Sequence, residues 1–79
     1  MSQTQSLQLN IGTRKINVTP DQSAERKDGK LTGLFYLTEN DENRGTLRFD
    51  KQSWENKNTG DLSYVELEAI AEAIMTEYK

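Results

Sequence analysis

The C-terminal residues 63–78 carry the strongest structural signal in this chain. Residues 63–66 fit a capping box, in which the Ser63 hydroxyl accepts from the Glu66 amide while the Glu66 carboxylate reaches back to the start of the helix. An apolar stripe with helical spacing follows: Tyr64, Leu67, Ile70, Ala71, Ile74, Met75 and Tyr78. This pattern predicts one amphipathic helix, which needs a surface on which to bury its stripe.

The rest of the chain supplies that surface as strands. Four segments alternate between apolar and polar residues or form short apolar runs: 7–11, 15–19, 31–38 and 45–50. Gly12-Thr13 separates the first two segments and predicts a hairpin, and Pro20 ends the second because proline cannot donate to a ladder. Asp28-Gly29 favours a type I′ turn, around which a second hairpin is expected to pivot.

Three polar connections complete the expected organisation. Residues 20–30 form either a strand or a loop, and the sequence leaves both readings open. Residues 39–44 are turn formers and predict a solvated loop. Residues 50–62 form a long connection, and we expect Trp54 to plug it against the core, because a lone tryptophan in a small domain is usually structural.

These elements predict an α+β fold within a single domain, residues 1–79. An antiparallel β-meander of four to five strands packs one face against the C-terminal helix, and residues 1–6 form a flexible N-terminus. The side chains expected to meet the helix are Leu7, Leu9, Ile11, Ile16, Val18, Phe35, Leu37, Leu47 and Phe49.

The composition makes this core lean and argues against catalysis. Leu, Ile, Val and Phe together account for 16 of 79 residues, which is near the lower limit for a folded domain. A partner or a second copy is therefore expected to help complete the core. The chain has no histidine and no cysteine, so the commonest general base, metal ligand and thiol nucleophile are missing.

No cofactor or metal site is expected either. The five glycines match neither a dinucleotide-binding fingerprint nor a phosphate-binding loop. The acidic residues in the 39–44 segment lack the spacing of a calcium loop. The N-terminus shows no signal peptide and no segment is long and apolar enough to span a membrane, so a cytoplasmic protein is expected.

Charge is distributed unevenly along the chain. Residues 1–30 carry five basic and three acidic residues, whereas residues 61–79 carry one basic and five acidic residues. The predicted helix is therefore an acidic rod, and its candidate interaction residues are Glu66, Glu68, Glu72 and Glu77. Two solvated faces of opposite sign explain this pattern, as do two faces with different partners.

The sheet face turned away from the helix is the second candidate surface. If Phe35 and Leu37 point inward, Leu34 and Tyr36 point outward, because strand side chains alternate. The residues expected on or around this face are Leu34, Tyr36, Lys15, Arg44 and Arg48. Three explanations fit such a surface: cover by residues 20–30, self-association as a homodimer, or recognition of another molecule.

Two functions follow from these features. The first is a non-catalytic protein-binding module, such as an inhibitor or adaptor, because aromatic and arginine side chains are favoured anchors at interfaces. In size and charge alone the chain resembles small acidic proteins that phages make against host machinery. The alternative is a single-stranded nucleic-acid-binding protein in which Tyr36 stacks on a base. A sequence pI near 4.9 weighs against nucleic acid.

Overall fold

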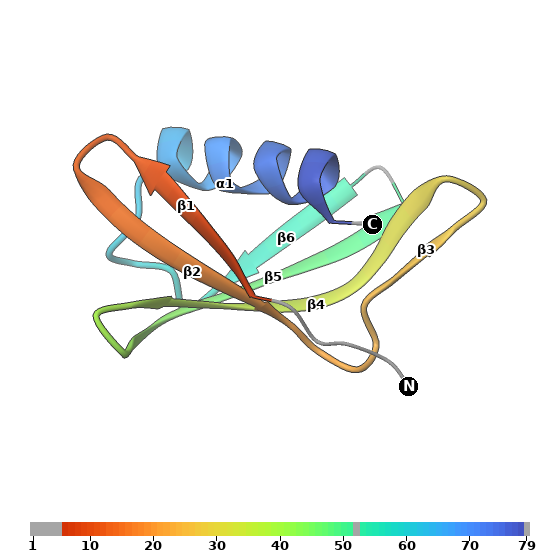
Figure 1. The fold of residues 1–79 in the computed structure, drawn as a ribbon, viewed down its shortest axis with the longest axis horizontal. Coiled ribbons are helices and arrows are strands. Elements are labelled where there is room, and N and C mark those ends of the chain that lie inside the picture. The colour runs from red at the N-terminus through yellow and green to blue at the C-terminus, as the bar shows by residue number, and fades with distance from the viewer. Residues whose placement is uncertain (1–5, 52, 79) are drawn as a thin grey trace.

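The computed structural model describes residues 6–51 and 53–78. Its elements are β1 (Leu7–Ile11), β2 (Arg14–Pro20), β3 (Glu25–Lys27), β4 (Lys30–Glu39), β5 (Glu42–Lys51), β6 (Ser53–Lys57) and α1 (Tyr64–Glu77). The predicted α+β fold is confirmed: one antiparallel sheet curves beneath a single helix (Figure 1). The flexible segment expected at residues 1–6 lies outside the described residues except for Ser6, whose hydroxyl is 3.1 Å from that of Thr19.

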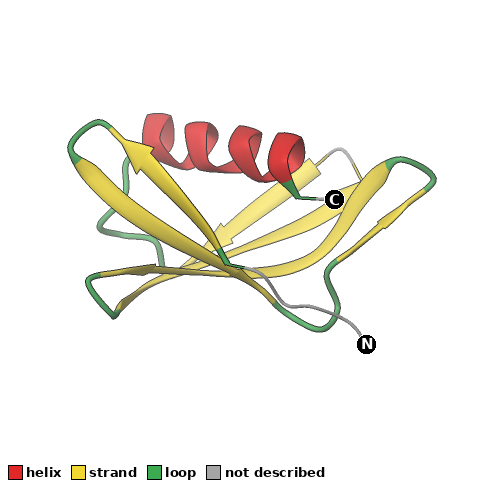
Figure 2. Cartoon of the chain, viewed as in Figure 1, coloured by secondary structure: helices red, strands yellow, loops and turns green. Residues whose placement is uncertain are grey.

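The sheet is a meander with the spatial order β1-β2-β4-β5-β6. β3 pairs with the first residues of β4, and β2 pairs with its last residues. β2 and β3 therefore lie end to end along the same edge of β4. Within the described residues, all the strands lie on one side of α1, and no helix covers the opposite side of the sheet (Figure 2). Among the described residues, the meander path has five strands, within the expected four to five, and the short β3 lies off this path.

The core lies between α1 and the concave face of the sheet. Its fully buried side chains come from both layers and include Ile16, Val18, Leu31, Phe35, Leu37, Leu47, Ile70 and Ile74. The ring of Phe35 is in edge-to-face contact with Phe49 and Tyr78, at centroid distances of 5.4 and 5.2 Å. The expected inward residues therefore face the helix, although Leu7 and Ile11 on the edge strand are only half-buried.

The N-terminus of α1 forms as predicted, and its C-terminus is stabilised by a residue of β3. The Glu66 amide donates to the Ser63 hydroxyl over 3.2 Å, and the Ser63 amide donates to the Glu66 carboxylate over 2.8 Å. No basic residue lies in the last turn of α1. The Arg26 guanidinium from β3 instead donates to the carbonyl of Tyr78 over 2.8 and 3.0 Å. The sheet thus supplies the positive charge that a helix C-terminus favours.

The prediction that Tyr64 belongs to the buried stripe is wrong. Tyr64 is 66% exposed, and its ring stacks on Trp54 at a centroid distance of 5.9 Å. Trp54 itself is half-buried and packs against the core from β6. The first turn of α1 therefore contacts the edge of the sheet through the stacked rings of Tyr64 and Trp54.

All three polar connections contain strand residues, which the sequence left open for residues 20–30 and did not predict for the other two. Residues 25–27 form β3, and Asp28 and Gly29 both have positive φ angles, as a type I′ turn requires. The prediction of a six-residue loop at 39–44 is wrong, because β4 and β5 extend until only Asn40 and Asp41 remain between them. The prediction of a long connection over residues 50–62 is also wrong, since this segment contains β6.

Two glycines allow neighbouring segments to approach the sheet closely. Gly33 has φ +116° and Gly45 has φ +106°, values that side chains of L-residues rarely adopt. A Cβ atom on Gly33 would collide with the backbone of Ser23 and Ala24. A Cβ atom on Gly45 would collide with the backbone oxygens of Lys57, at the end of β6, and Asn58, just after it. Both contacts fix loops against strand positions that accept only glycine.

Candidate interaction surface

The sheet face opposite α1 is lined mainly by polar side chains around one tyrosine. Along β4, Phe35 and Leu37 are buried toward the helix, whereas Tyr36 is 39% exposed and Leu34 half-buried on the other side. Tyr36 lies opposite Thr19 on β2 and Thr46 on β5. Tyr36 is therefore near the middle of this face, with hydroxyl-bearing side chains on either side. We call this surface the open face.

The Tyr36 ring is held in place by the segment that follows β2. Its hydroxyl donates a 2.7 Å hydrogen bond to Asp21, whose other carboxylate oxygen accepts from the amide and hydroxyl of Ser23. This hydrogen bond raises the pKa of Tyr36 and lowers the pKa of Asp21. Residues 21–24 thus fix the tyrosine without covering it.

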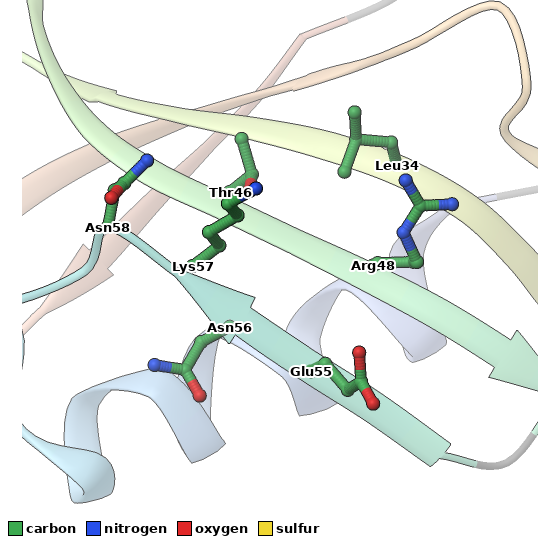
Figure 3. Close-up of a pocket in the computed structure, with 7 residues that line it drawn as sticks. All are labelled: Leu34, Thr46, Arg48, Glu55, Asn56, Lys57 and Asn58. Atoms are coloured by element: carbon green, nitrogen blue, oxygen red, sulfur yellow. The ribbon is translucent and has the colours of Figure 1, made fainter.

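A shallow groove lies across β4, β5 and β6 (Figure 3), and one of its lining residues, Thr46, is the register partner of Tyr36. Its volume is about 460 Å³, and it is lined by Leu34, Thr46, Arg48, Glu55, Asn56, Lys57 and Asn58. Arg48 is the register partner of both Leu34 on β4 and Glu55 on β6. The groove therefore combines apolar surface with charges of both signs.

Charges on and beside the open face nearly balance. The basic residues are Lys15, Lys27, Lys30, Arg48, Lys51 and Lys57. The acidic residues are Asp21, Glu25, Asp28, Asp50 and Glu55. Within residues 6–51 and 53–78, none of these basic groups has an ion-pair partner. The surface is thus free to pair its charges with those of another molecule.

The structure brings together three of the five residues predicted for this face. Leu34, Tyr36 and Arg48 lie next to one another as expected. Lys15 also points to this side, but it is four residues along β2 from Thr19, which is opposite Tyr36. At about 3.3 Å per residue it lies roughly 13 Å away along the strand. Lys15 therefore lies at a far corner of the face.

Arg44 was predicted for the open face, and this prediction is wrong. The register of β4 and β5 shifts between Leu37 and Thr38, which leaves Arg44 without a partner on β4. Such a bulge redirects the extra side chain. The Arg44 guanidinium turns toward the helix side, where it lies 3.0 Å from Glu39 and 2.8 Å from Glu42.

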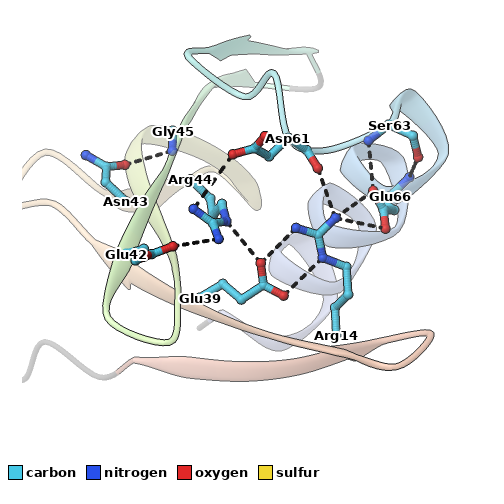
Figure 4. Close-up of polar contacts among 9 residues, drawn as sticks. All are labelled: Arg14, Glu39, Glu42, Asn43, Arg44, Gly45, Asp61, Ser63 and Glu66. Carbon is cyan, nitrogen blue, oxygen red and sulfur yellow. Dashed lines mark hydrogen bonds and ion pairs between the residues drawn. The ribbon is translucent and has the colours of Figure 1, made fainter.

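Arg44 belongs to an ion-pair network that joins the sheet to the start of α1 (Figure 4). Glu39 is at its centre, with its side chain only 13% exposed. Arg14 donates to both oxygens of this carboxylate, over 3.0 and 2.7 Å, and to Glu66 over 3.3 Å. Hydrogen bonds from Arg14 and Arg44 lower the pKa of Glu39 to about 2. The network is structural, since its charges satisfy one another.

The acidic face predicted on the helix is smaller than expected. Glu68, Glu72 and Glu77 are exposed. Glu66 is not free, because it closes the capping box and accepts hydrogen bonds from Arg14. The backbone hydrogen bond from Ser63 is the main reason that the pKa of Glu66 is lowered. Glu66 therefore has a structural role, and three acids remain available.

Sequence reasoning missed several residues of the surface. Asp21 was assigned to an undetermined segment, and its hydrogen bond to Tyr36 spans 15 positions. Glu55 and Lys57 were assigned to a loop, because β6 has only one apolar residue, Trp54, and so lacks an alternating signal. The Asp28-Gly29 turn was expected as the pivot of a hairpin, but the pairing of Lys27 with Lys30 across it was not predicted.

Among the described residues, no group of three or more histidine, cysteine or acidic side chains is positioned to hold a metal ion. In the same part of the chain, no helix has the length and apolar character needed to cross a bilayer. No protein-family model, curated protein or solved structure matches this chain.

Proposed function

We propose that the chain is a non-catalytic protein-binding module that engages its partner through the open face. The single observation that carries this proposal is the Tyr36 side chain, which is 39% exposed near the middle of the face while its hydroxyl is fixed by Asp21. A tyrosine already held in one orientation loses little conformational entropy on binding. Arg48 and the adjoining groove add a second anchor of a type favoured at interfaces.

Charge balance supports a protein partner over a polyanion. Acidic and basic side chains are interspersed on the open face, and neighbouring positions such as Arg48 and Glu55 carry opposite signs. A polyanionic backbone gains from contacts with bases and is repelled by the acids between them. A protein surface with both signs matches this pattern, and such complementarity favours specific partners.

The exposed acids of α1 offer a second contact surface, on the side of the sheet opposite the open face. Glu68 and Glu72 are one turn apart on the helix, and the three arginines on that side of the sheet are occupied by internal contacts. An uncompensated acidic helix speeds encounter with a basic target. We propose a cytoplasmic location for this interaction.

Affinity capture with matched variants tests the proposal. Wild-type protein, a Tyr36→Ala/Arg48→Ala variant and a Val65→Ala control are used as baits in an extract of the cells that naturally produce the protein. Val65 is 74% exposed on the helix side, so its truncation removes exposed apolar surface away from the open face. We expect a partner that wild type and the control retain and that the double variant loses, with the difference reproduced by calorimetry on purified proteins.

Folding of each bait is checked by circular dichroism before capture. Equal retention of every partner by wild type and the folded double variant would refute the role of the open face. If the double variant unfolds, Tyr36→Phe and Arg48→Gln provide a milder comparison, because both retain most of the side-chain volume.

Single-stranded nucleic acid is the second candidate, and one observation favours it. Lys27, Lys30 and Lys51 gather at the tip of the β3–β4 hairpin around a hollow of about 260 Å³. Like charges directly opposite each other destabilise a sheet, so the pairing of Lys27 with Lys30 is expected to serve a function. Titration of fluorescent single-stranded DNA and RNA at low and moderate salt tests this candidate. No binding at low salt removes it.

A further inference from the structure

β6 is an edge strand whose outer backbone groups are available for pairing. It is the last strand in the sheet order, and β5 is its only neighbour among the described strands. Asp50 and Ser53 are register partners that close a two-residue connection. The closing pair of such a hairpin exchanges backbone hydrogen bonds, and these alternate along the ladder. The backbone groups of Trp54 and Asn56 therefore point to the free edge.

We propose that two copies of this chain associate by pairing β6 with β6 in antiparallel fashion, about a two-fold axis at Asn56. This inference does not depend on the proposed function, because it rests on the edge of the sheet and not on Tyr36. Asn56 of one copy would exchange its free backbone hydrogen bonds with Asn56 of the other. An isologous contact of this kind uses the same residues on both subunits.

The charges of β6 select this register. With the axis at Asn56, Glu55 of each copy lies opposite Lys57 of the other, so that two opposite-charge pairs form. These are non-hydrogen-bonded pairs, in which cross-strand side chains approach most closely. The other backbone position open to pairing is Trp54, and an axis there would place Glu55 opposite Ser53, so this residue would lose its opposite-charge partner.

Exposed aromatic surface beside β6 supports a partner at the same edge. Tyr64 stacks on Trp54 and remains 66% exposed. A second copy adding its strand to β6 would shield this pair from water, a gain of apolar burial for a chain with a lean core. The symmetry also joins the two sheets into one, with both open faces on the same side, so a dimer presents two copies of Tyr36 to a partner.

Sedimentation velocity over a wide range of protein concentration measures the association. Wild type is expected to form a concentration-dependent dimer. Glu55→Lys and Lys57→Glu each convert both cross-strand pairs from attraction to repulsion, so we expect dimerisation about tenfold or more weaker. Lys15→Glu carries the same charge change as Lys57→Glu but lies on β2, away from β6. It is expected to dimerise like wild type.

Complementation separates the proposed register from a general charge effect. A Glu55→Lys/Lys57→Glu double variant keeps opposite charges across the axis and is expected to regain dimerisation. An equimolar mixture of the two single variants is expected to form a heterodimer, because each lysine then faces a glutamate. A double variant or a mixture that stays as monomeric as the single variants would overturn this register.

Asn56→Pro tests the backbone contact. Proline is tolerated where the amide faces solvent on an edge strand, so we expect a folded protein by circular dichroism that no longer dimerises. A monomeric wild type at the highest concentration reached overturns the proposal, as does an Asn56→Pro protein that folds and dimerises like wild type. If Asn56→Pro fails to fold, the charge variants still decide the outcome.

Discussion

The guanidinium of Arg14 donates hydrogen bonds to both carboxylate oxygens of Glu39, although the two residues lie 25 positions apart in the sequence. Arg14 also donates to the Asp61 carbonyl over 2.9 Å and to Glu66 at the start of α1. One side chain on β2 therefore connects β4, the segment before the helix and the helix itself. This connection fixes the entry of α1 onto the concave side of the sheet.

Glu39 is expected to make stability depend on pH. Its pKa is lowered from 4.5 to about 2 in the folded protein. A carboxylate with a lowered pKa stabilises the fold fully above its unfolded pKa, and this contribution is lost as pH falls toward the folded value. Glu39→Gln should therefore reduce the free energy of unfolding at pH 7 and make its loss between pH 4.5 and pH 2 less steep.

Urea denaturation at several pH values measures this effect. Glu77→Gln removes an exposed acid of α1 and serves as the charge-matched control, with a stability close to wild type at every pH. Identical pH profiles for Glu39→Gln and wild type would contradict the role assigned to the network.

The hydrogen bond from Tyr36 to Asp21 makes a second prediction. The Asp21 carboxylate raises the pKa of Tyr36 above its usual value of 10.0. Asp21→Asn keeps an oxygen acceptor but removes the charge, so the pKa of Tyr36 should return toward 10.0. Stability from this pair is present below the unfolded pKa and lost as pH rises through the raised value. Ring-carbon NMR titration follows it, and Tyr36→Phe assigns the resonance. An unchanged Tyr36 pKa in Asp21→Asn would contradict the role of the Asp21 carboxylate.

Local sequence signals correctly predicted the start of the helix, one tight turn and the orientation of Tyr36. The capping box at Ser63 and Glu66 forms with both hydrogen bonds, because a helix start depends on four consecutive residues. The turn at Asp28-Gly29 forms for a similar reason, since both residues tolerate positive φ. Alternation also placed Tyr36 on the open face, because side chains in a regular strand can point only to one of two sides.

Features that leave no alternating apolar signal, or that depend on distant contacts, were not predictable. Arg44 followed the alternation rule on paper, but an extra residue on β5 turned it toward Glu39. β6 was missed because an exposed edge strand buries only one of its side chains in part and carries no apolar period. Asp21 gains its role only when the chain folds back along β4. Arg44 and β6 have partners nearby in the sequence, so they were missed because a bulge and an exposed edge strand give no alternating apolar signal.

Gly33 should be far less tolerant of substitution than Gly60. Gly33→Ala forces φ +116° on a residue with a side chain and drives its Cβ into the backbone of Ala24. We expect a loss of stability of about 2 kcal/mol or more, since strained φ values alone cost roughly 1–3 kcal/mol. Gly60 has open space at its Cβ position and no positive φ. Gly60→Ala is therefore the matched control, and equal urea midpoints for the two variants would contradict this account.

Arg26 is expected to hold the last turn of α1 to the sheet. Its guanidinium donates to the carbonyls of Met75 and Tyr78 at a helix end that has no base of its own. Arg26→Gln removes this charge from the negative end of the helix dipole and should cost about 1 kcal/mol. Lys27→Gln changes the neighbouring residue of β3, which faces the opposite side, and controls for charge.

Hydrogen exchange localises the Arg26 effect. Amides in the last turn of α1, including that of Tyr78, which donates to the carbonyl of Ile74 over 3.0 Å, should exchange faster in Arg26→Gln than in Lys27→Gln. Arg26→Lys should lie between them, because an ammonium keeps the charge but cannot serve two carbonyls with the planar fork of a guanidinium. Uniformly faster exchange across α1 and the sheet would show that Arg26 supports the whole fold and not the helix end.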